Sequence, residues 1–310
     1  MRMDTTNYCN LRCSMCPMRL SDSDPSRNWE HMGTEVFNMI RTEVFPIART
    51  VGISCGAEPL TNPMFIQHLQ ALYESGVPYR EMVTNGTLLT RALIKSILQY
   101  PPTSLFISVD GAESETHSAI RDGANLGAIL DMTVELISGR EKNLFPMVGF
   151  STTLQKDNLH ELADIVRLAH RTGAASVGVV PLVPYEGLNT IDLVVDTESA
   201  VAVEEISRAR SVAFELGIEF HLSSEVSDRG SAHPCPYLLD TVFINHQGSI
   251  FPCPYWNTEY PAGNILEGFD NIWNGAEYRR LRDGDFGGTD NCLQCPEVTS
   301  RTVEVTKAKQ

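Results

Sequence analysis

Three cysteines stand close together at the start of the chain, Cys9, Cys13 and Cys16, with the spacing C-x3-C-x2-C. Three thiolates on one short loop can hold three corners of a cubane iron–sulfur cluster. The loop has no fourth cysteine, so one iron keeps an open coordination position where a ligand can bind and react. Zinc is the alternative, but structural zinc usually takes paired C-x2-C ligands, four of them close together. The spacing therefore favours a reactive iron–sulfur cluster.

Four further cysteines stand near the other end of the chain, with the spacing C-x17-C-x38-C-x2-C. They are Cys235, Cys253, Cys292 and Cys295. Four thiolates are enough to close an iron–sulfur cluster completely. Zinc is a serious rival here, because four thiolates ending in a C-x2-C pair also make a structural zinc site.

Composition narrows the class of protein. The 310 residues carry a formal net charge of −15 and are 42% hydrophobic. That charge would repel a nucleic acid backbone, and no run approaches the roughly 20 apolar residues of a membrane span. The N-terminus runs from Met1 into the cysteine loop without a basic and then apolar leader, so we expect a cytoplasmic protein that binds neither nucleic acid nor membrane. In that reducing compartment, clustered cysteines indicate metal ligation better than disulfides.

The elements that must position these cysteines alternate between β-branched runs and amphipathic helical stretches. We expect strands at residues 2–8, 50–54, 80–84, 104–109, 146–153 and 175–180. Helices should follow, one capped by Thr34, one starting near Pro63 and one from Leu159 to Arg171 that ends at Gly173. This order predicts an α/β fold, a partial (β/α)6 barrel whose ligands collect at the carboxyl ends of the strands.

The pattern changes after about residue 190. A helix over 197–216 and a strand over 218–221 lead to a β-hairpin with its turn at Asn245–Gly248, and a last helix should cover 269–283. We therefore expect four segments. They are a barrel over 1–190, a connecting helix and strand over 191–230, a C-terminal cluster-binding extension over 231–297 and a polar tail over 298–310.

Three polar turns follow the second, third and fourth predicted strands. They are Gly56-Ala57-Glu58-Pro59, Thr84-Asn85-Gly86 and Ser108-Val109-Asp110-Gly111. Each turn alone is commonplace, since such residues favour turns generally. In this order, at strand ends and after the C-x3-C-x2-C loop, they resemble the radical S-adenosylmethionine (radical SAM) superfamily. The resemblance covers the barrel and implies a [4Fe-4S] cluster that binds S-adenosylmethionine (SAM) at its open iron.

The resemblance also implies roles for residues of this chain. Gly56–Pro59 is similar to the family's GGEP motif, whose backbone and glutamate receive the methionyl ammonium of SAM. Arg121 resembles the arginine that pairs with the carboxylate of SAM, and Met15 stands where many relatives have an aromatic residue that packs on adenine. The residues expected to contact SAM are Met15, Gly56, Ala57, Glu58, Thr84, Asn85, Ser108, Asp110 and Arg121.

The C-terminal region resembles the SPASM and twitch extensions of the same superfamily. The resemblance rests on Gly248–Cys253 and on Gly263–Ile265 before a helix that contains Trp273. A full SPASM extension has seven cysteines and two auxiliary clusters, whereas four cysteines match the shorter twitch type, a hairpin and helix with one auxiliary [4Fe-4S] cluster. A closed cluster can carry electrons but cannot bind substrate.

Cys55 is the one cysteine that neither set uses. It is either a small buried hydrophobe or, in a radical epimerase, a donor of a hydrogen atom to a substrate radical. Tyr185 and Glu186 follow the sixth predicted strand, and their position suggests contact with substrate.

The resemblance implies an enzyme that cleaves SAM to a 5′-deoxyadenosyl radical, which abstracts hydrogen from a substrate carbon. The compact extension is similar to that of enzymes that oxidise aminocyclitols and sugars, so we expect dehydrogenation of such an alcohol in specialised metabolism, including antibiotic biosynthesis. A flavodoxin or ferredoxin-type partner would supply the electron. Epimerisation, sugar-acid decarboxylation and peptide maturation are alternatives, although the chain has no leader-binding residues to spare before Cys9. A two-cluster electron carrier is the alternative that is not an enzyme.

Overall fold

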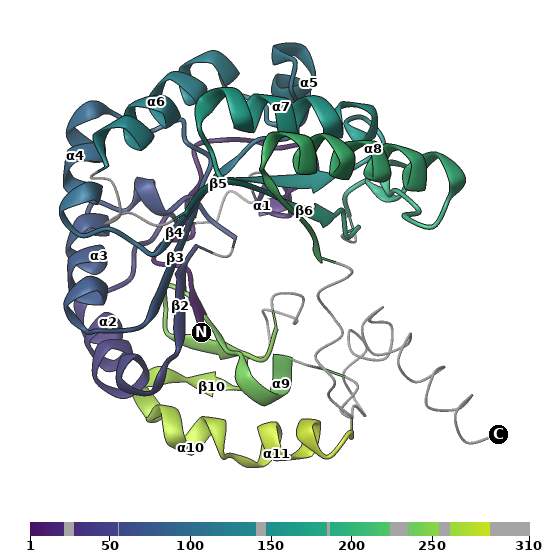
Figure 1. The fold of residues 1–310 in the computed structure, drawn as a ribbon. Coiled ribbons are helices and arrows are strands. Elements are labelled where there is room, and N and C mark those ends of the chain that lie inside the picture. The colour runs from purple at the N-terminus through teal and green to yellow at the C-terminus, as the bar shows by residue number, and fades with distance from the viewer. Residues whose placement is uncertain are drawn as a thin grey trace.

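One ten-stranded sheet organises the chain, with the order β10-β9-β8-β1-β2-β3-β4-β5-β6-β7 (Figure 1). The computed structural model describes residues 1–21, 28–54, 56–140, 147–184, 187–223, 235, 237–253 and 261–285. The strands are β1 (Arg2–Met3), β2 (Thr50–Ile53), β3 (Tyr79–Thr84), β4 (Ser104–Ser108), β5 (Met147–Leu154), β6 (Ser176–Pro181), β7 (Glu219–Leu222), β8 (Phe243–Ile244), β9 (Ser249–Phe251) and β10 (Gly263–Asn264). Strands β1 to β7 pair in parallel, so their carboxyl ends lie at one edge.

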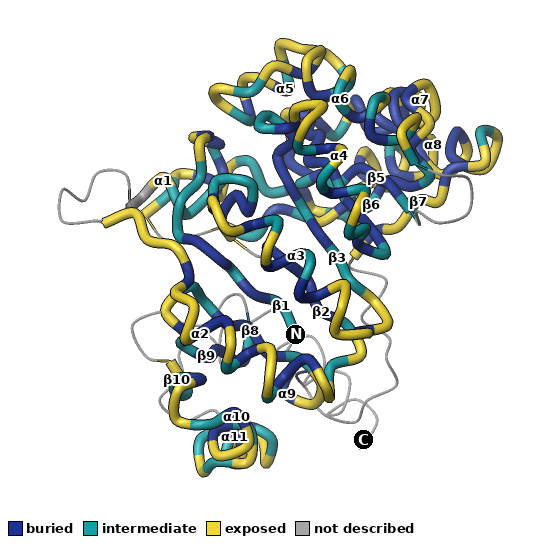
Figure 2. Tube along the Cα trace, turned by 90° about the vertical axis from the view of Figure 1, so that its left-hand side faces the viewer, coloured by how far each residue is buried: buried dark blue, intermediate teal, exposed yellow. Residues whose placement is uncertain are grey.

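Helices cover the outer face of the parallel strands (Figure 1). The main ones are α2 (Thr34–Met39), α3 (Phe65–Glu74), α4 (Arg91–Gln99), α5 (Ser114–Ile120), α6 (Leu126–Gly139), α7 (Leu162–Thr172) and α8 (Ala200–Leu216). Shorter helical segments are α1 (Met18–Ser21), η1 (Ile40–Val44), η2 (Phe45–Ile47), η3 (Pro59–Thr61), η4 (Leu159–Glu161) and η5 (Ile191–Leu193). Figure 2 shows buried residues on the strands and on the inner sides of these helices. The core therefore lies between sheet and helices, as in other α/β folds.

The extension continues the sheet from the free edge of β1. Strand β8 pairs in parallel with β1, with Phe243 opposite Arg2, and β8, β9 and β10 form an antiparallel ribbon. The extension also holds α9 (Tyr237–Asp240), η7 (Ile265–Glu267), α10 (Phe269–Trp273) and α11 (Ala276–Arg282). Glu43 in η1 accepts a hydrogen bond from the backbone N–H of Phe269, which ties α10 to the barrel.

The predicted α/β class and parallel barrel strands are confirmed, as is the hairpin turn at Asn245–Gly248. Helix α7 ends as predicted, with Gly173 in the left-handed conformation at φ 80°. The cap at Thr34 is wrong, because Gly33 occupies the cap position of α2 and no side chain caps that end. The predicted last helix is two helices, and a side chain at the intervening Gly275 would lie 2.7 Å from the carbonyl oxygen of Asn271.

Among the described residues, no helix has the length and apolar character required to cross a membrane.

Candidate active site

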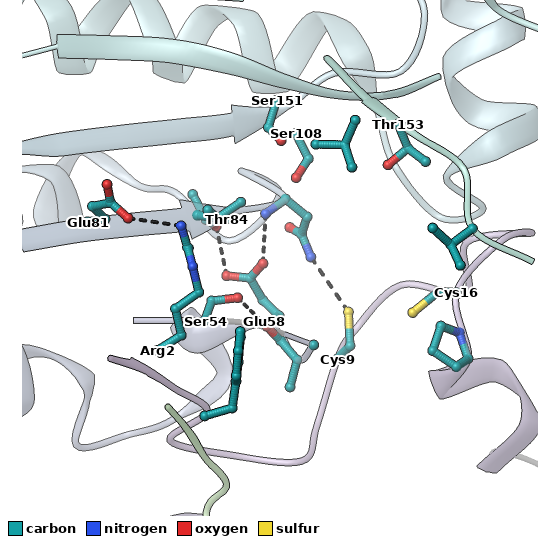
Figure 3. Close-up of a pocket in the computed structure, with 18 of the residues that line it drawn as sticks. Arg2, Cys9, Cys16, Ser54, Glu58, Glu81, Thr84, Ser108, Ser151 and Thr153 are labelled. Carbon is teal, nitrogen blue, oxygen red and sulfur yellow. Dashed lines mark hydrogen bonds and ion pairs between the residues drawn. The ribbon is translucent and has the colours of Figure 1, made fainter. Parts of the chain in front are cut away.

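A cavity of about 930 Å³ lies inside the barrel, and its lining runs from the cysteine loop to the extension (Figure 3). The strands expose alternate residues to it, since side chains of a strand point to opposite faces. In β3, for example, Glu81 and Val83 line the cavity while Met82 is fully buried on the other face. The cavity therefore belongs to the interior face of the sheet, and the turns after the strands form its wall near the cysteines.

Cys9, Cys13 and Cys16 all line this cavity. The loop that carries them is fixed to the end of α5, because the backbone N–H of Ser14 donates to the carbonyl of Ile120 (2.8 Å). Met15 is buried beside the loop in a small apolar cluster with Leu11, Cys13, Ile120 and Leu182. One short loop thus brings three thiols and the predicted Met15 to one wall.

The chemistry of these three thiols fits a cluster. Burial raises the pKa of Cys13 to about 12 although the nearby Arg121 guanidinium lowers it, so this thiol would ionise at neutral pH only with a further positive charge beside it, such as bound iron. In the part of the chain that the structure describes, no three His, Cys, Asp or Glu side chains converge as ligands of one metal ion. In a cubane each thiolate binds its own iron, so a cluster does not require such convergence.

Glu58 joins two of the predicted turns. Its Oε1 accepts from the Thr84 hydroxyl (2.7 Å) and from the Leu60 N–H (3.1 Å), and its Oε2 accepts from the Asn85 N–H (2.7 Å). Asn85 in turn directs its side-chain amide toward Cys9, with Nδ2 3.9 Å from Sγ (Figure 3). Burial raises the pKa of Glu58, while these donors favour its ionised form. Glu58 therefore fixes the turns that face the cysteines.

The backbone just before this turn is strained. Ser54 directly follows β2 and has a φ of 87°, a conformation that residues other than glycine rarely adopt. Its hydroxyl donates to the carbonyl of Ala57 (2.9 Å), and Asp4 accepts from the Gly56 N–H (3.0 Å). Strain of this kind is held only where surrounding contacts enforce it, and it is common at functional sites. Gly56, Ala57, Glu58, Thr84 and Asn85 all line the cavity, as predicted contacts of a cofactor would.

Arg121 connects the third predicted turn, Ser108-Val109-Asp110-Gly111, to the cysteine loop. Its Nε lies 2.7 Å from Oδ2 of Asp110, and its Nη1 lies 3.9 Å from Sγ of Cys13. Burial lowers the pKa of Arg121, but the facing Asp110 carboxylate and the Cys13 thiol more than offset that effect and raise it, so the guanidinium stays charged. Arg121 and Ser108 line the cavity, whereas Asp110 is fully buried against Arg121. The structure thus places Asp110 as the support of Arg121.

Two residues that the sequence analysis missed hold this turn from behind. The Asn158 amide donates to the carbonyl oxygens of Asp110 and Thr153, both at 2.9 Å. Glu161 accepts from the backbone N–H groups of Ala112 (2.7 Å) and Glu113 (3.2 Å) and from the hydroxyl of Thr116. Glu161 was included only as part of a helical pattern, and no local motif marks it as a residue that positions the site.

The cavity carries further polar side chains that the sequence analysis also missed. Ser151 and Thr153 lie in the carboxyl-terminal half of β5, on the side of Ser108 and Cys16 (Figure 3). At the end away from the cysteines, an ion pair joins Arg2 of β1 to Glu81 of β3 (Figure 3). The sequence does show a charged residue in each of these two strands. Only the register of the strands shows that Arg2 and Glu81 contact each other.

Two of the four C-terminal cysteines, Cys235 and Cys253, are among the residues that the structure describes. Cys235 is buried just before α9, and Cys253 follows β9 close enough to Tyr278 to help raise the pKa of that buried phenol, whose shift comes chiefly from burial. Tyr237 and Phe243, which follow Cys235 in the chain, line the far end of the cavity. The predicted site residues Cys55, Tyr185, Glu186, Cys292 and Cys295 lie outside the described residues.

Family models match both parts of the chain. The model of the radical SAM superfamily matches residues 3–169, and the SPASM model, described as an iron–sulfur cluster-binding domain, matches residues 229–296. The second match spans all four C-terminal cysteines, which supports iron–sulfur over zinc there.

Curated relatives and solved structures agree with these models. An AdoMet-dependent heme synthase of Methanosarcina barkeri is 28% identical, over 90% of this chain and 83% of the relative. The mycofactocin maturase MftC of Mycobacterium tuberculosis is 25% identical, over 96% of this chain and 75% of the relative. Streptococcus suis SuiB bound to S-adenosylmethionine superposes with a TM-score of 0.73 at 14% identity, covering 96% of this chain and 70% of SuiB. The structure of anSMEcpe with bound AdoMet and a peptide superposes with a TM-score of 0.69 at 16% identity, covering 96% of this chain and 86% of anSMEcpe.

Proposed function

The chain belongs to the radical SAM superfamily and carries a SPASM-type iron–sulfur domain, and from this premise we propose that it dehydrogenates an alcohol carbon of a polar small molecule. The substrate class that we propose is a carbohydrate or aminocyclitol. Iron–sulfur clusters and S-adenosylmethionine are the cofactors of this family, and the proposed ligands are Cys9, Cys13 and Cys16 for the SAM-binding cluster.

The observation that carries this proposal is the group of hydroxyl side chains that lines the interior of the barrel. A closed (β/α) barrel is normally filled by Val, Ile and Leu side chains, which leave no room for a ligand. Here hydroxyls of Ser54, Ser108, Ser151 and Thr153 line an open cavity between the cysteine loop and the extension. Its volume of about 930 Å³ lies in the range of small-molecule sites. Such a lining suits a substrate with many hydroxyl groups.

When bound, the cluster and SAM supply the 5′-deoxyadenosyl radical that accepts the hydrogen atom. The protein then has to hold SAM and keep the substrate carbon nearby. Glu58, Asn85 and Arg121 line the cavity near the cysteine loop, and we propose that they bind SAM. A reductant of the flavodoxin or ferredoxin class supplies the first electron.

The balance of the proposed reaction defines the role of the extension. The alcohol carbon loses one hydrogen atom, its hydroxyl loses one proton, and one electron leaves to give the ketone. We assign that electron to one auxiliary [4Fe-4S] cluster on Cys235, Cys253, Cys292 and Cys295. Tyr237 and Phe243 support this assignment, because they follow Cys235 closely in the chain and themselves line the cavity.

Peptide modification is the second candidate. It is favoured by the similarity to a mycofactocin maturase and by the fold shared with SuiB, which was also solved with its precursor peptide SuiA. Epimerisation with Cys55 as hydrogen donor and decarboxylation of a sugar acid differ from dehydrogenation in redox balance. Epimerisation removes no hydrogen overall, and decarboxylation releases carbon dioxide.

The test is product analysis with the full chain, reconstituted without oxygen and supplied with SAM and dithionite. Carbon-deuterated sugars, aminocyclitols and short peptides are the substrates. We expect deuterium in 5′-deoxyadenosine and a sugar or aminocyclitol product with two hydrogens fewer. A product with the same number of hydrogens, in which protium replaces the abstracted deuterium, would overturn the proposed reaction in favour of epimerisation. Loss of carbon dioxide, or turnover of peptides alone, would overturn it in favour of decarboxylation or peptide modification.

A metal count tests the auxiliary cluster separately. Two cubanes predict about eight irons and about eight sulfides per chain. About four irons with one zinc would contradict the auxiliary cluster without affecting the rest of the proposal.

A further inference from the structure

Arg2 and Glu81 face each other inside the barrel, toward the amino ends of the strands (Figure 3). The register places Arg2 beside Gly52 and Gly52 beside Glu81, so the arginine reaches across β2 to the carboxylate on β3. A side chain at Gly52 would begin 3.2 Å from Nη1 and 3.3 Å from Cγ of Arg2. Glycine therefore leaves the space in which Arg2 lies.

The pair retains unused hydrogen-bonding capacity. Nη2 of Arg2 lies 3.0 Å from Oε2 of Glu81, and this is the one side-chain hydrogen bond that either makes within the described residues. The side chains are 41% and 29% exposed although they lie in the barrel, so they face the cavity. A guanidinium carries five N–H donors and a carboxylate about four acceptor positions. Donors and acceptors thus stand side by side and open to a ligand.

An apolar surface adjoins the pair. Phe243 of β8 is the register partner of Arg2 and also lines the cavity. Its ring contacts Tyr237, with centroids 6.2 Å apart. Adjacent hydroxyls, or a hydroxyl beside an amine, need a donor and an acceptor close together, and the C–H face of a sugar-like ring packs well on an aromatic side chain.

We propose that Arg2 and Glu81, with Phe243 beside them, anchor the substrate through two adjacent polar groups, vicinal hydroxyls or an amino alcohol. This inference rests on the proposed function and names the part of the cavity that recognises the substrate. Asn85 lies four positions after Glu81 along the strand direction, which corresponds to about 13 Å at 3.3 Å per residue. A substrate held at Arg2 and Glu81 therefore extends toward the cysteine loop, where its other end is exposed to hydrogen abstraction.

The competing explanation is that the ion pair only straps β1 to β3. A charge exchange, Arg2→Glu together with Glu81→Arg, separates the two explanations because it keeps an ion pair but inverts the places of donor and acceptor. If the ion pair only links β1 to β3, the charge exchange should leave stability and substrate binding unchanged. If the pair binds substrate, the exchange should weaken binding, since the polar groups of the substrate are fixed relative to the reacting carbon.

The experiment measures ligand binding by saturation-transfer NMR on the anaerobic holoenzyme with SAM. The probes are glucosamine, myo-inositol and, as a molecule without adjacent polar groups, cyclohexanol. We expect the unaltered protein to bind glucosamine or myo-inositol and not cyclohexanol. Glu81→Gln and the charge exchange should each weaken binding at least tenfold while the thermal midpoint of the charge exchange stays near that of the unaltered protein. Arg80→Gln is the matched control, because Arg80 precedes Glu81 on β3 and its guanidinium instead donates to the carbonyl of Val77.

Three results would overturn the anchor. They are equal binding by the charge exchange, equal weakening by Arg80→Gln, and no binding of either polyol by the unaltered protein. Product analysis keeps this test apart from that of the proposed function. If the anchor binds polyols and no hydrogen is lost from any of them, the dehydrogenase proposal fails and the anchor stands. If the charge exchange oxidises a substrate with unchanged KM, the anchor fails and the dehydrogenase stands.

Discussion

The two ends of the cavity hold their charges in opposite ways. Near the cysteines, Glu58 and Asp110 are almost completely buried, and each accepts hydrogen bonds or an ion pair from several fixed partners. At the far end, Arg2 and Glu81 have each other and remain partly open to the cavity. A buried charge with several partners is rigid, whereas an open pair can exchange a partner for a ligand. We call the end with Glu58 and Asp110 the prepared end and the end with Arg2 and Glu81 the adaptable end. In our proposal the prepared end holds the cofactor and the adaptable end holds the substrate.

The largest effect should come from removing a cysteine at the prepared end. Cys13→Ala should lower the iron content from about eight to about four per chain and abolish the formation of 5′-deoxyadenosine. Alanine is small and apolar, so folding should persist, and circular dichroism checks this. If the iron content and the formation of 5′-deoxyadenosine both stay at the level of the unaltered protein, the loop is not the cluster site. The distinction between the two ends of the cavity would then fail.

The next effect tests whether the prepared end depends on the pairing of buried charges. Asp110→Asn leaves the Arg121 guanidinium, which is 12% exposed, without its carboxylate. Loss of one member of a buried pair costs about 3–5 kcal/mol, so the free energy of unfolding should fall by that amount. Denaturant unfolding measures it, with Asp164→Asn as the control because Asp164 belongs to an exposed pair with Arg167. A loss equal to that of the control would mean that Asp110 does not hold Arg121.

A smaller effect concerns the support behind that pair. Glu161→Gln keeps the shape of the side chain but replaces an acceptor oxygen with a donor, opposite the N–H groups of Ala112 and Glu113 and the hydroxyl of Thr116. The buried mismatch should cost about 1–3 kcal/mol. Glu277→Gln, in an exposed pair with Arg280, is the control for the same chemical change. If both variants lose equal stability, Glu161 does not support the turn.

The prepared end was largely predictable from sequence, and the adaptable end was not. The loop, Gly56–Pro59 and Thr84–Gly86 are local motifs whose order along the chain fixes the strand ends where they meet, and each of them contributes residues to the cavity lining. Arg2 and Glu81 are 79 positions apart, and their contact depends on the register of β1, β2 and β3 and on the missing side chain at Gly52. The register of the strands follows from the packing of the whole sheet, so no local sequence pattern predicts it.

Helix ends show the same limit. Gly173 was predicted because a left-handed cap is a local property of glycine. Thr34 suits a cap by residue type, yet the chain enters α2 from Gly33 in an extended conformation, so Thr34 lies inside the helix. The break between α10 and α11 lies at Gly275, where the carbonyl oxygens of Asn271 and Ile272 approach the glycine closely. Ile272 and Tyr278 repeat at helical spacing across this point, so the sequence pattern predicts one continuous helix.

The smallest effect concerns a buried ionisable group that has neither several partners nor an opening to the cavity. His68 in α3 is buried, stacks on Phe37 with centroids 4.0 Å apart, and its Nδ1 finds no hydrogen-bond partner among the described residues. Burial lowers the pKa of His68 from 6.5 to about 4. Below pH 6.5 the unfolded chain therefore binds a proton that the folded chain refuses, and stability falls as pH falls toward 4.

By pH 5.5 this one histidine should remove about 1.4 kcal/mol of stability relative to pH 7.5. His68→Phe keeps the ring stack and removes the titrating group, so the variant should lose about 1.4 kcal/mol less than the unaltered protein over that interval, measured by denaturant unfolding at both pH values. His170→Gln, at an exposed position of α7, should leave the interval unchanged. Equal pH dependence in the His68→Phe variant and the unaltered protein would mean that His68 is solvated or paired. The contrast between partnered and unpartnered buried groups would then not hold outside the cavity.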